Sequence, residues 1–213
     1  MKNSVVKKEG GWIWPISDEN SWKYQNEYQD LINYIEPHLK DKKIMIQAGG
    51  NCGFILNTFV NHFDYIYTFE PDPINFYCLN HNITNKNVIK MQSCLGNNNT
   101  PVNVQQLIRP DRPNDTGGVH IAGDGYIPSI KIDDLNLTGC DLIQLDIEGY
   151  ELNALLGAVK TIKKYKPVLC IEFCEKWLNR YNTTSENLLA LLKELNYIQV
   201  EEYGADKIFI YNV

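Results

Sequence analysis

Apolar and polar residues alternate along the chain with two different periods. Residues 43–48 form a short apolar run typical of a buried strand, and residues 54–63 carry apolar side chains at helical spacing. Residues 65–69 form a β-rich run, and residues 74–83 follow as a helix that begins after a Pro-Asp-Pro turn. This order predicts two consecutive β-α units.

The next segments are less regular. Residues 87–94 are predicted to form a third strand. Residues 96–128 are turn-rich, and the Arg-Pro-Asp-Arg-Pro-Asn-Asp run at 109–115 is incompatible with a helix or an inner strand. We expect a mobile loop here, which could carry substrate contacts or be only a solvated connection.

The second half of the chain repeats the β-α pattern more clearly. A strand, a helix, a strand, a helix and the two strands of a hairpin are predicted, in this order, at residues 140–146, 152–162, 168–173, 185–195, 197–200 and 207–211. The alternation predicts a doubly wound α/β fold. Its sheet would be mostly parallel, with helices on both faces and an antiparallel C-terminal strand at one side.

Residues 1–42 precede this pattern and are predicted to form an N-terminal helical extension or lid, whereas residues 43–213 form the main domain. A helix is expected over residues 20–40. Trp12 and Trp14 lie in an aromatic-rich segment before it, where they could cover a site or simply pack against the core.

Composition narrows the classes of protein. The 213 residues are 44% hydrophobic and 22% charged, as expected for a globular chain with a sizeable core. The net charge of -6 creates no overall positive field, so we expect no binding to nucleic acid or to an anionic membrane surface. The lack of a signal-peptide core and of a membrane-length apolar run favours a cytoplasmic protein. The six scattered cysteines are interpreted as buried thiols rather than a zinc site or a disulfide framework.

Candidate binding residues follow the first two predicted strands, because ligands of doubly wound sheets bind beyond the carboxyl ends of the strands. The first turn contains Gly49 and Gly53 and leads into a helix whose free N–H groups could face a ligand. Asn51 stands where a dinucleotide-binding turn would have its second glycine, which disfavours a pyrophosphate. Glu70, followed by Pro71, could accept hydrogen bonds from both hydroxyls of a ribose. These features favour S-adenosylmethionine, which has a ribose but no phosphate.

Three segments resemble the FkbM family of S-adenosylmethionine-dependent methyltransferases. They are Gln-Ala-Gly-Gly-Asn-Cys-Gly at 47–53, Thr-Phe-Glu-Pro-Asp-Pro-Ile-Asn-Phe at 68–76, and Asp-Leu-Ile-Gln-Leu-Asp-Ile-Glu-Gly-Tyr-Glu at 141–151. The Asp-Ile-Glu-Gly-x-Glu signature is the most specific, and the resemblance extends from about residue 43 to the C-terminus. It implies a class I methyltransferase fold, which is Rossmann-like with a seven-stranded sheet.

The resemblance also implies a set of cofactor contacts. The glycine turn would receive the methionine end of S-adenosylmethionine, Glu70 the ribose, and Ser93 and Cys94 the adenine. Gln47 stands where many relatives have an acidic residue, so its contact with the cofactor ammonium would be a neutral hydrogen bond. Asp146 would lie beside the sulfonium methyl group and the acceptor.

Three acidic residues, Asp146, Glu148 and Glu172, are candidates for catalysis. Asp146 could take a proton from an acceptor hydroxyl, orient it or hold a divalent cation, or it could only cap the following helix, whose first turn Glu148 would favour. Glu172 lies in an apolar run and should face the cleft or a partner, because burial of an unpaired carboxylate is costly. His120 could act as a base, or join a metal site with Asp146 and Glu172, but no ligand spacing supports a metal and none is predicted.

These features predict an enzyme that transfers the methyl group of S-adenosylmethionine to a hydroxyl oxygen on a small molecule or glycan. An NAD-dependent oxidoreductase on a similar sheet and a non-catalytic cofactor-binding module are the alternatives. Arg109 and Arg112 could steer an anionic acceptor, or they could belong to a surface loop in which Asp111 and Asp115 balance their charge.

Overall fold

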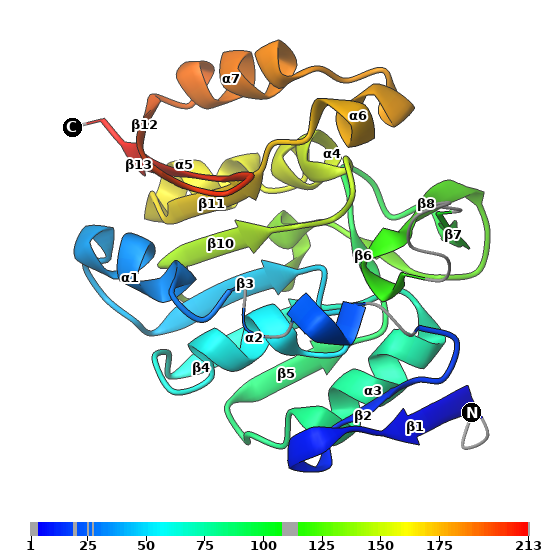
Figure 1. Cartoon of the computed structure of the whole chain (residues 1–213). Coiled ribbons are helices and arrows are strands. Elements are labelled where there is room, and N and C mark those ends of the chain that lie inside the picture. The colour runs from blue at the N-terminus through cyan, green and yellow to red at the C-terminus, as the bar shows by residue number, and fades with distance from the viewer. Residues whose placement is uncertain (1–3, 19–20, 25, 27, 108–114, 213) are drawn as a thin grey trace.

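The predicted strands lie side by side in one seven-stranded sheet (Figure 1). The computed structural model describes residues 4–18, 21–24, 26, 28–107 and 115–212. The strand order is β12-β13-β11-β10-β3-β4-β5; β13 is antiparallel to both neighbours, and the pairs from β11 to β5 are parallel. The strands are β3 (Ile44–Ala48), β4 (Tyr65–Phe69), β5 (Val88–Met91), β10 (Leu142–Leu145), β11 (Val168–Glu172), β12 (Tyr197–Tyr203) and β13 (Asp206–Tyr211). The expected mixed sheet of seven strands is thus confirmed.

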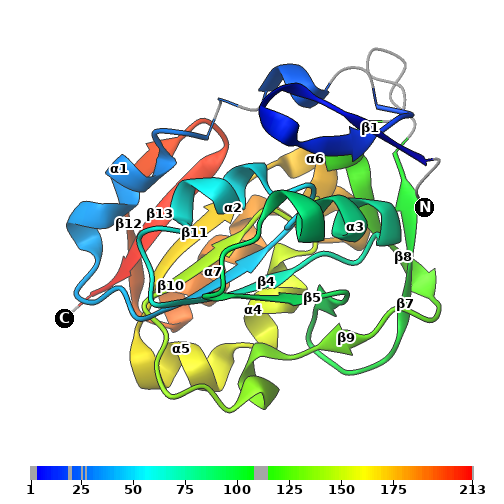
Figure 2. The ribbon, with the colours of Figure 1, turned by 90° about the horizontal axis from the view of Figure 1, so that it is seen from below.

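Helices cover both faces of the sheet because successive strand residues point to opposite faces. On one face Met45 shares a hydrophobic cluster with Leu56 and Phe59, and on the other Ile143 shares one with Leu155. Figure 2 shows α1, α2 and α3 on one side of the sheet and α4 and α5 on the other. The helices are α1 (Leu31–Ile35), α2 (Phe54–Phe59), α3 (Pro73–Asn82), α4 (Glu151–Leu156), α5 (Val159–Tyr165), α6 (Glu175–Leu178) and α7 (Ser185–Glu194). Among the described residues, no helix has both the length and the apolar character needed to cross a bilayer.

The direction of the strand order reverses between β3 and β10. From β3 the chain proceeds outward through β4 to β5, whereas from β10 it proceeds through β11 to the opposite edge. The backbone amide of Asp146, just after β10, donates to the carbonyl of Ala48 at the end of β3 at 3.2 Å. The segments that follow these two strands therefore start from the same point, where doubly wound sheets bind ligands.

The helix expected over residues 20–40 is largely absent from the described part of the chain. The segment contains 3-10 turns at Ser21–Tyr24 and Glu36–His38, and α1 is short. Trp22 lies 5.5 Å from Phe54 between ring centroids, and such tertiary aromatic contacts outweigh local helix propensity. Before it, β1 (Val5–Lys7) and β2 (Ile13–Pro15) form a hairpin.

The stretch expected to be one irregular loop contains regular structure. The predicted third strand ends at Met91, and β6 (Cys94–Leu95) then pairs in parallel with β9 (Ser129–Ile130). Between them, β7 (Val102–Gln106) and β8 (Val119–Asp124) form an antiparallel pair. Arg109 and Arg112 lie outside the described residues.

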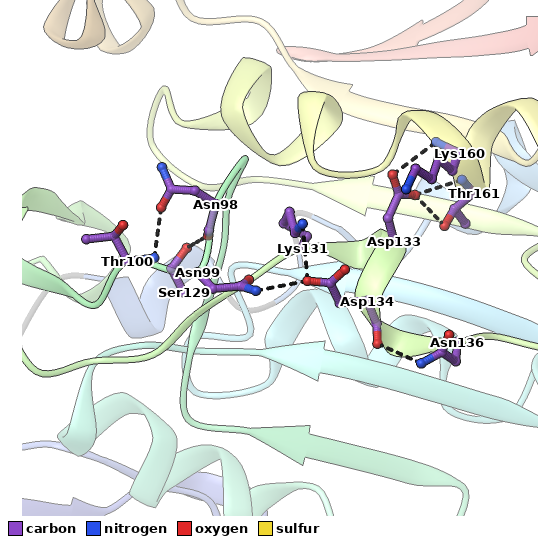
Figure 3. Close-up of polar contacts among 10 residues, drawn as sticks. All are labelled: Asn98, Asn99, Thr100, Ser129, Lys131, Asp133, Asp134, Asn136, Lys160 and Thr161. Carbon is purple, nitrogen blue, oxygen red and sulfur yellow. Dashed lines mark hydrogen bonds and ion pairs between the residues drawn. The ribbon is translucent and has the colours of Figure 1, made fainter.

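The single helix expected over residues 152–162 is in fact two helices, α4 and α5. The break is stabilised from outside by Asp133, which lies on the 3-10 turn Ile132–Leu135. The Asp133 amide donates to the carbonyl of Gly157, and its carboxylate accepts from the amides of Lys160 and Thr161 at 3.1 and 2.8 Å (Figure 3). The second helix therefore begins with a capping carboxylate that periodicity alone could not reveal.

Asp133→Ala should lower the free energy of unfolding by about 1–2 kcal/mol, because the amides at the start of α5 lose their acceptor. Asp134→Ala is the matched control. Asp134 lies on the same turn, but in Figure 3 its carboxylate contacts the side chains of Asn99 and Lys131 instead of helix amides. Its backbone carbonyl accepts a hydrogen bond from the side chain of Asn136. Urea denaturation measures both variants, and equal losses would contradict the capping role.

Candidate functional site

A cavity of about 290 Å³ lies at the carboxyl ends of the central strands. Its walls include the residues that follow or end four neighbouring strands: Gly49 after β3, Glu70 after β4, Asp146 after β10 and Glu172 at the end of β11. Polar groups from separate strands thus converge on one concave space, as is typical of a small-molecule site in this type of sheet.

The glycine turn after β3 is required by the protein's own packing. Gly49 has φ +85°, and a Cβ atom on it would lie 1.8 Å from the carbonyl oxygen of Asp146. Asn51 also adopts a left-handed conformation, with φ +46°, which asparagine tolerates better than most residues. Both residues line the cavity, so the turn brings the ends of β3 and β10 together at its wall.

In the first β-α unit, two residues predicted to contact the cofactor do not line the cavity. Gln47 is fully buried within β3, where its Nε2 donates to the carbonyl of Gly49 at 3.0 Å and its Oε1 accepts from the hydroxyl of Thr68. Gly53 is the N-cap residue of α2 and packs against Ile83. Gln47 therefore supports the glycine turn from within the sheet.

Glu70 is a nearly buried carboxylate in the cavity wall, 4% exposed. It accepts hydrogen bonds from the backbone amides of Asn51 at 2.6 Å and Asp72 at 2.8 Å. Burial raises the pKa of Glu70 to about 8, although these two hydrogen bonds oppose the shift. Pro71 follows it in the wall, and Asp72 caps α3. Glu70 thus joins the glycine turn to the start of α3 and keeps lone pairs for a ligand.

The predicted adenine contacts divide between two neighbouring residues. Cys94 lines the cavity, and burial raises the pKa of its thiol, which is neutral at pH 7. Ser93 is 2% exposed and is not part of the lining, and its hydroxyl has no hydrogen-bond partner among the described residues. Of these two residues, therefore, only Cys94 forms part of the cavity wall.

The Asp-Ile-Glu-Gly-x-Glu signature forms a tight loop between β10 and α4. Glu148 and Gly149 both have positive φ, +57° and +103°, and a Cβ atom on Gly149 would lie 2.2 Å from the carbonyl oxygen of Trp177. Glu151 fastens this loop, because its Oε1 accepts from the amides of Ile147 and Gly149 at 3.1 and 3.2 Å. A non-glycine residue held left-handed is strained, and here the strained residue, Glu148, lines the cavity.

The helix-capping alternative for Asp146 is not supported. Helix α4 begins at Glu151 with Tyr150 as its N-cap, and among the described residues no N-cap side-chain bond is formed there. Asp146 instead lines the cavity next to Glu148 and Glu172. Its position favours a role toward a ligand.

Asp146 and Glu172 belong to a row of carboxyl groups across three strands. The register Gln144↔Cys170 places Asp146 beside Glu172, and Glu172 pairs with Asp206 of β13. Burial, followed by the negative charges of Asp146, Glu151 and Glu148, raises the pKa of Glu172 to about 11. Burial and the charge of Asp146 likewise raise the pKa of Asp206 to about 8. At neutral pH Glu172 therefore holds a proton.

Several other cavity residues were not predicted as site residues. Trp14 comes from the N-terminal segment, Thr116 from the turn before β8, Tyr150 from the signature loop and Trp177 from α6. The aromatic-rich segment in the sequence indicated that Trp14 could lie at a site, whereas no feature of the sequence indicated this for Thr116. His120 also lines the cavity; burial, followed by the charge of Arg180, lowers its pKa. Within the described part of the chain, no three His, Cys, Asp or Glu side chains are grouped so that they could hold a metal ion.

Comparison with known proteins identifies one matching family model. The methyltransferase FkbM domain matches residues 48–198, a range that contains both the glycine turn and the signature loop. No curated protein sequence matches the chain.

Solved structures of methyltransferases have a similar fold. The methyltransferase FkbM from Methylobacillus flagellatus KT matches with a TM-score of 0.56 and 22% identity, over 86% of this chain and 48% of that one. This chain thus spans about half the length of that protein. A candidate S-adenosyl-L-methionine-dependent methyltransferase from Methanococcus maripaludis matches with a TM-score of 0.51 and 15% identity, over 92% and 90% of the two chains. SMU.1697c, a candidate methyltransferase from Streptococcus mutans solved in complex with SAH, matches with a TM-score of 0.47 and 12% identity, over 86% and 95%.

The carboxyl row makes a testable prediction about stability. Because the pKa of Glu172 is raised from about 4.5 to about 11 by folding, the folded protein binds more protons than the unfolded chain between these values. The stabilisation of the folded state by the proton bound to Glu172 is fully present below the unfolded pKa, and it is lost as the pH rises toward the folded pKa. Glu172→Gln should therefore melt close to wild type at pH 5 and at a higher temperature at pH 9.

The thermal melting temperature measured from pH 5 to pH 9 tests this prediction. The groups that face Glu172 are Asp146, Glu148, Glu151, Cys174 and Asp206, and all remain in the variant. Glu201→Gln, at an exposed position on β12, is the control and should follow the wild-type profile. A parallel profile for Glu172→Gln would show that Glu172 is ionised in the folded protein.

Proposed function

The chain belongs to the FkbM methyltransferase family, and on this premise we propose that it transfers the methyl group of S-adenosylmethionine to a hydroxyl oxygen of a small molecule or glycan. The observation that carries this proposal is the cavity in which Glu70, Asp146 and the glycine turn meet. It lies at the reversal of the strand order, where a doubly wound sheet would hold a cofactor.

The residues present fit an adenosyl cofactor. Glu70 is buried, already ordered by two backbone amides, and able to accept further hydrogen bonds from ribose hydroxyls. Cys94 and Pro71 form a less polar part of the same cavity wall, which suits the adenine ring. Asp146 and Glu148 add negative charge, which favours a sulfonium ion over a neutral thioether.

S-adenosylmethionine supplies a methyl group already activated by its positive sulfur. The protein then has three tasks: to align the acceptor, to exclude water and to accept the acceptor's proton. Glu172 holds a proton at neutral pH, so it can donate a hydrogen bond to an acceptor oxygen. Asp146 and Glu148 are the carboxylates on the same wall that would orient the hydroxyl and take its proton as the new C–O bond forms.

Glu70→Ala should weaken binding of S-adenosylhomocysteine by about 1–3 kcal/mol, because hydrogen bonds from the ribose hydroxyls to the carboxyl oxygens are lost. Isothermal titration calorimetry measures the change in affinity. Circular dichroism checks that loss of the bonds between Glu70 and the glycine turn has not unfolded the protein. Glu70→Gln, which keeps one acceptor oxygen, should bind with intermediate affinity. Glu201→Ala, a solvent-exposed change on β12, is the control. Unchanged affinity in Glu70→Ala would exclude the ribose role.

Asp146→Asn should reduce methyl transfer at least about tenfold while leaving S-adenosylhomocysteine affinity within a factor of about three, because the amide cannot accept the hydroxyl proton. Turnover is followed as S-adenosylhomocysteine produced over a panel of hydroxyl-bearing small molecules and glycans. Asp141→Asn is the control. Asp141 lies at the opposite end of the same strand, where its carboxylate accepts hydrogen bonds from the amides of Lys43 and Ile44. If both variants turn over alike, Asp146 has no role in the proton transfer. An apo protein that binds NAD and not S-adenosylhomocysteine would overturn the proposed function itself.

A further inference from the structure

One wall of the cavity comes from two segments that lie far apart in the sequence and outside the central sheet. Trp14 and Ser21 belong to the N-terminal segment, and Thr116 and Gly117 belong to the turn before β8. Figure 2 shows the N-terminal hairpin lying over α3, on the helical layer that also carries α2. The family-model match begins at residue 48, so the N-terminal half of this wall lies outside it.

Asp18 joins the two segments. Its Oδ2 accepts hydrogen bonds from Nε1 of Trp14 and from the backbone amide of Thr116, both at 3.1 Å. Its Oδ1 accepts from the amide of Ser21 at 2.9 Å. The Ser21 hydroxyl then donates to Asp115 at 2.6 Å, which ties the segments together a second time. Asp18 is only 2% exposed, so these charge-assisted bonds form in a region of low dielectric, where they are strong.

Thr116 is held at both ends of its backbone but not at its side chain. Its amide donates to Asp18, and its carbonyl accepts from Nδ2 of Asn75 at 3.1 Å. The residue is 5% exposed and lines the cavity, yet its hydroxyl has no hydrogen-bond partner among the described residues. A buried hydroxyl without a partner destabilises the folded protein. The surrounding bonds therefore fix, at the cavity wall, a polar group that a bound molecule can satisfy.

Asn75 places this hydroxyl relative to the rest of the site. It lies in the first turn of α3, is 3% exposed, lines the cavity and lies near enough to Glu70 to lower the pKa of that carboxyl. A single side chain thus interacts with both the carboxyl group assigned to the ribose and the backbone of Thr116. The Thr116 hydroxyl consequently belongs to the Glu70 side of the cavity, rather than to the carboxyl row around Asp146.

We propose that the Thr116 hydroxyl is a further cofactor-binding group, which hydrogen-bonds a polar atom of the adenosyl part of the ligand, and that Asp18 is the positioning residue that holds it there. This inference rests on the proposed function, because it takes an adenosyl compound as the occupant. It adds a ligand contact from outside the strand ends. It also assigns the N-terminal segment a role in binding through Asp18.

Thr116→Val tests the proposal directly, because valine has nearly the same shape and lacks the hydroxyl. Without ligand, the variant should melt at or above the wild-type temperature, since an unsatisfied buried hydroxyl has been removed. Its affinity for S-adenosylhomocysteine should fall about three- to tenfold, as expected for one lost hydrogen bond. Thr116→Ser should retain wild-type affinity. Calorimetric titration and thermal melting give the two readouts.

The adenosyl assignment is tested with 5'-methylthioadenosine, which lacks the amino-acid tail of S-adenosylhomocysteine. Thr116→Val should weaken both ligands by the same factor. Loss of affinity for S-adenosylhomocysteine alone would place the hydroxyl at the amino-acid tail and overturn the assignment. Unchanged affinity for both ligands would show that Thr116 is only a wall residue. If wild-type protein binds neither compound, it is the proposed function that fails.

Asp18→Asn tests the positioning role. An amide is a weaker acceptor for three N–H donors than a carboxylate, so the variant should also bind S-adenosylhomocysteine about three- to tenfold more weakly. The double variant with Thr116→Val should lose little more than either single variant, because both changes act on the same contact. Asp133→Asn is the matched control: it alters another carboxylate that accepts backbone amides, at α5, and should not change affinity. Fully additive losses would contradict positioning of Thr116 by Asp18.

Discussion

The close approach of the backbone after β3 to the backbone after β10 is the constraint on which the site depends. The carbonyl of Asp146 occupies the place where a side chain on Gly49 would be, and the amide of Asp146 bonds the carbonyl of Ala48. Glycine at this position is therefore dictated by the meeting of two strands and needs no ligand to explain it. Because the two strand ends meet, the proposed cofactor turn and the proposed catalytic carboxylate face one space.

A second consequence of this arrangement is an accumulation of buried acids. Strand ends that converge bring Asp146, Glu172 and Asp206 to the same level of adjacent strands. These carboxyl groups cannot all ionise in a poorly solvated space, so some retain protons and the remainder favour a cation. Residues that destabilise the empty protein in this way are typical of sites whose occupant supplies the missing charge or hydrogen bonds.

The sequence was most informative where a residue's role follows from its place in a repeating pattern. Strand ends are recognisable from apolar runs, so Glu70 and Asp146 could be assigned to the cavity without coordinates. Gln47 was predicted as a cofactor contact, but it lies inside the strand, where its amide bonds the turn and does not line the cavity. Thr116 could not be predicted, since its position depends on bonds to Asp18 and Asn75 that are remote in sequence. The 3-10 turn that contains Trp22 was not predicted for the same reason, because it is fixed by a contact with Phe54 rather than by local propensity.

Helix α3 is a common anchor for both halves of the outer cavity wall. The backbone of Ile13 exchanges two hydrogen bonds with the side chain of Asn82, and the carbonyl of Thr116 accepts from Asn75 near the other end of the same helix. Although Asp18 and Thr116 are 98 positions apart, both are thereby already tethered to one rigid element when they meet, which leaves little chain entropy to lose. Separation of the two segments consequently breaks a handful of bonds and none of the sheet. Such a separation would be a local opening, and its free energy would be lower than that of global unfolding.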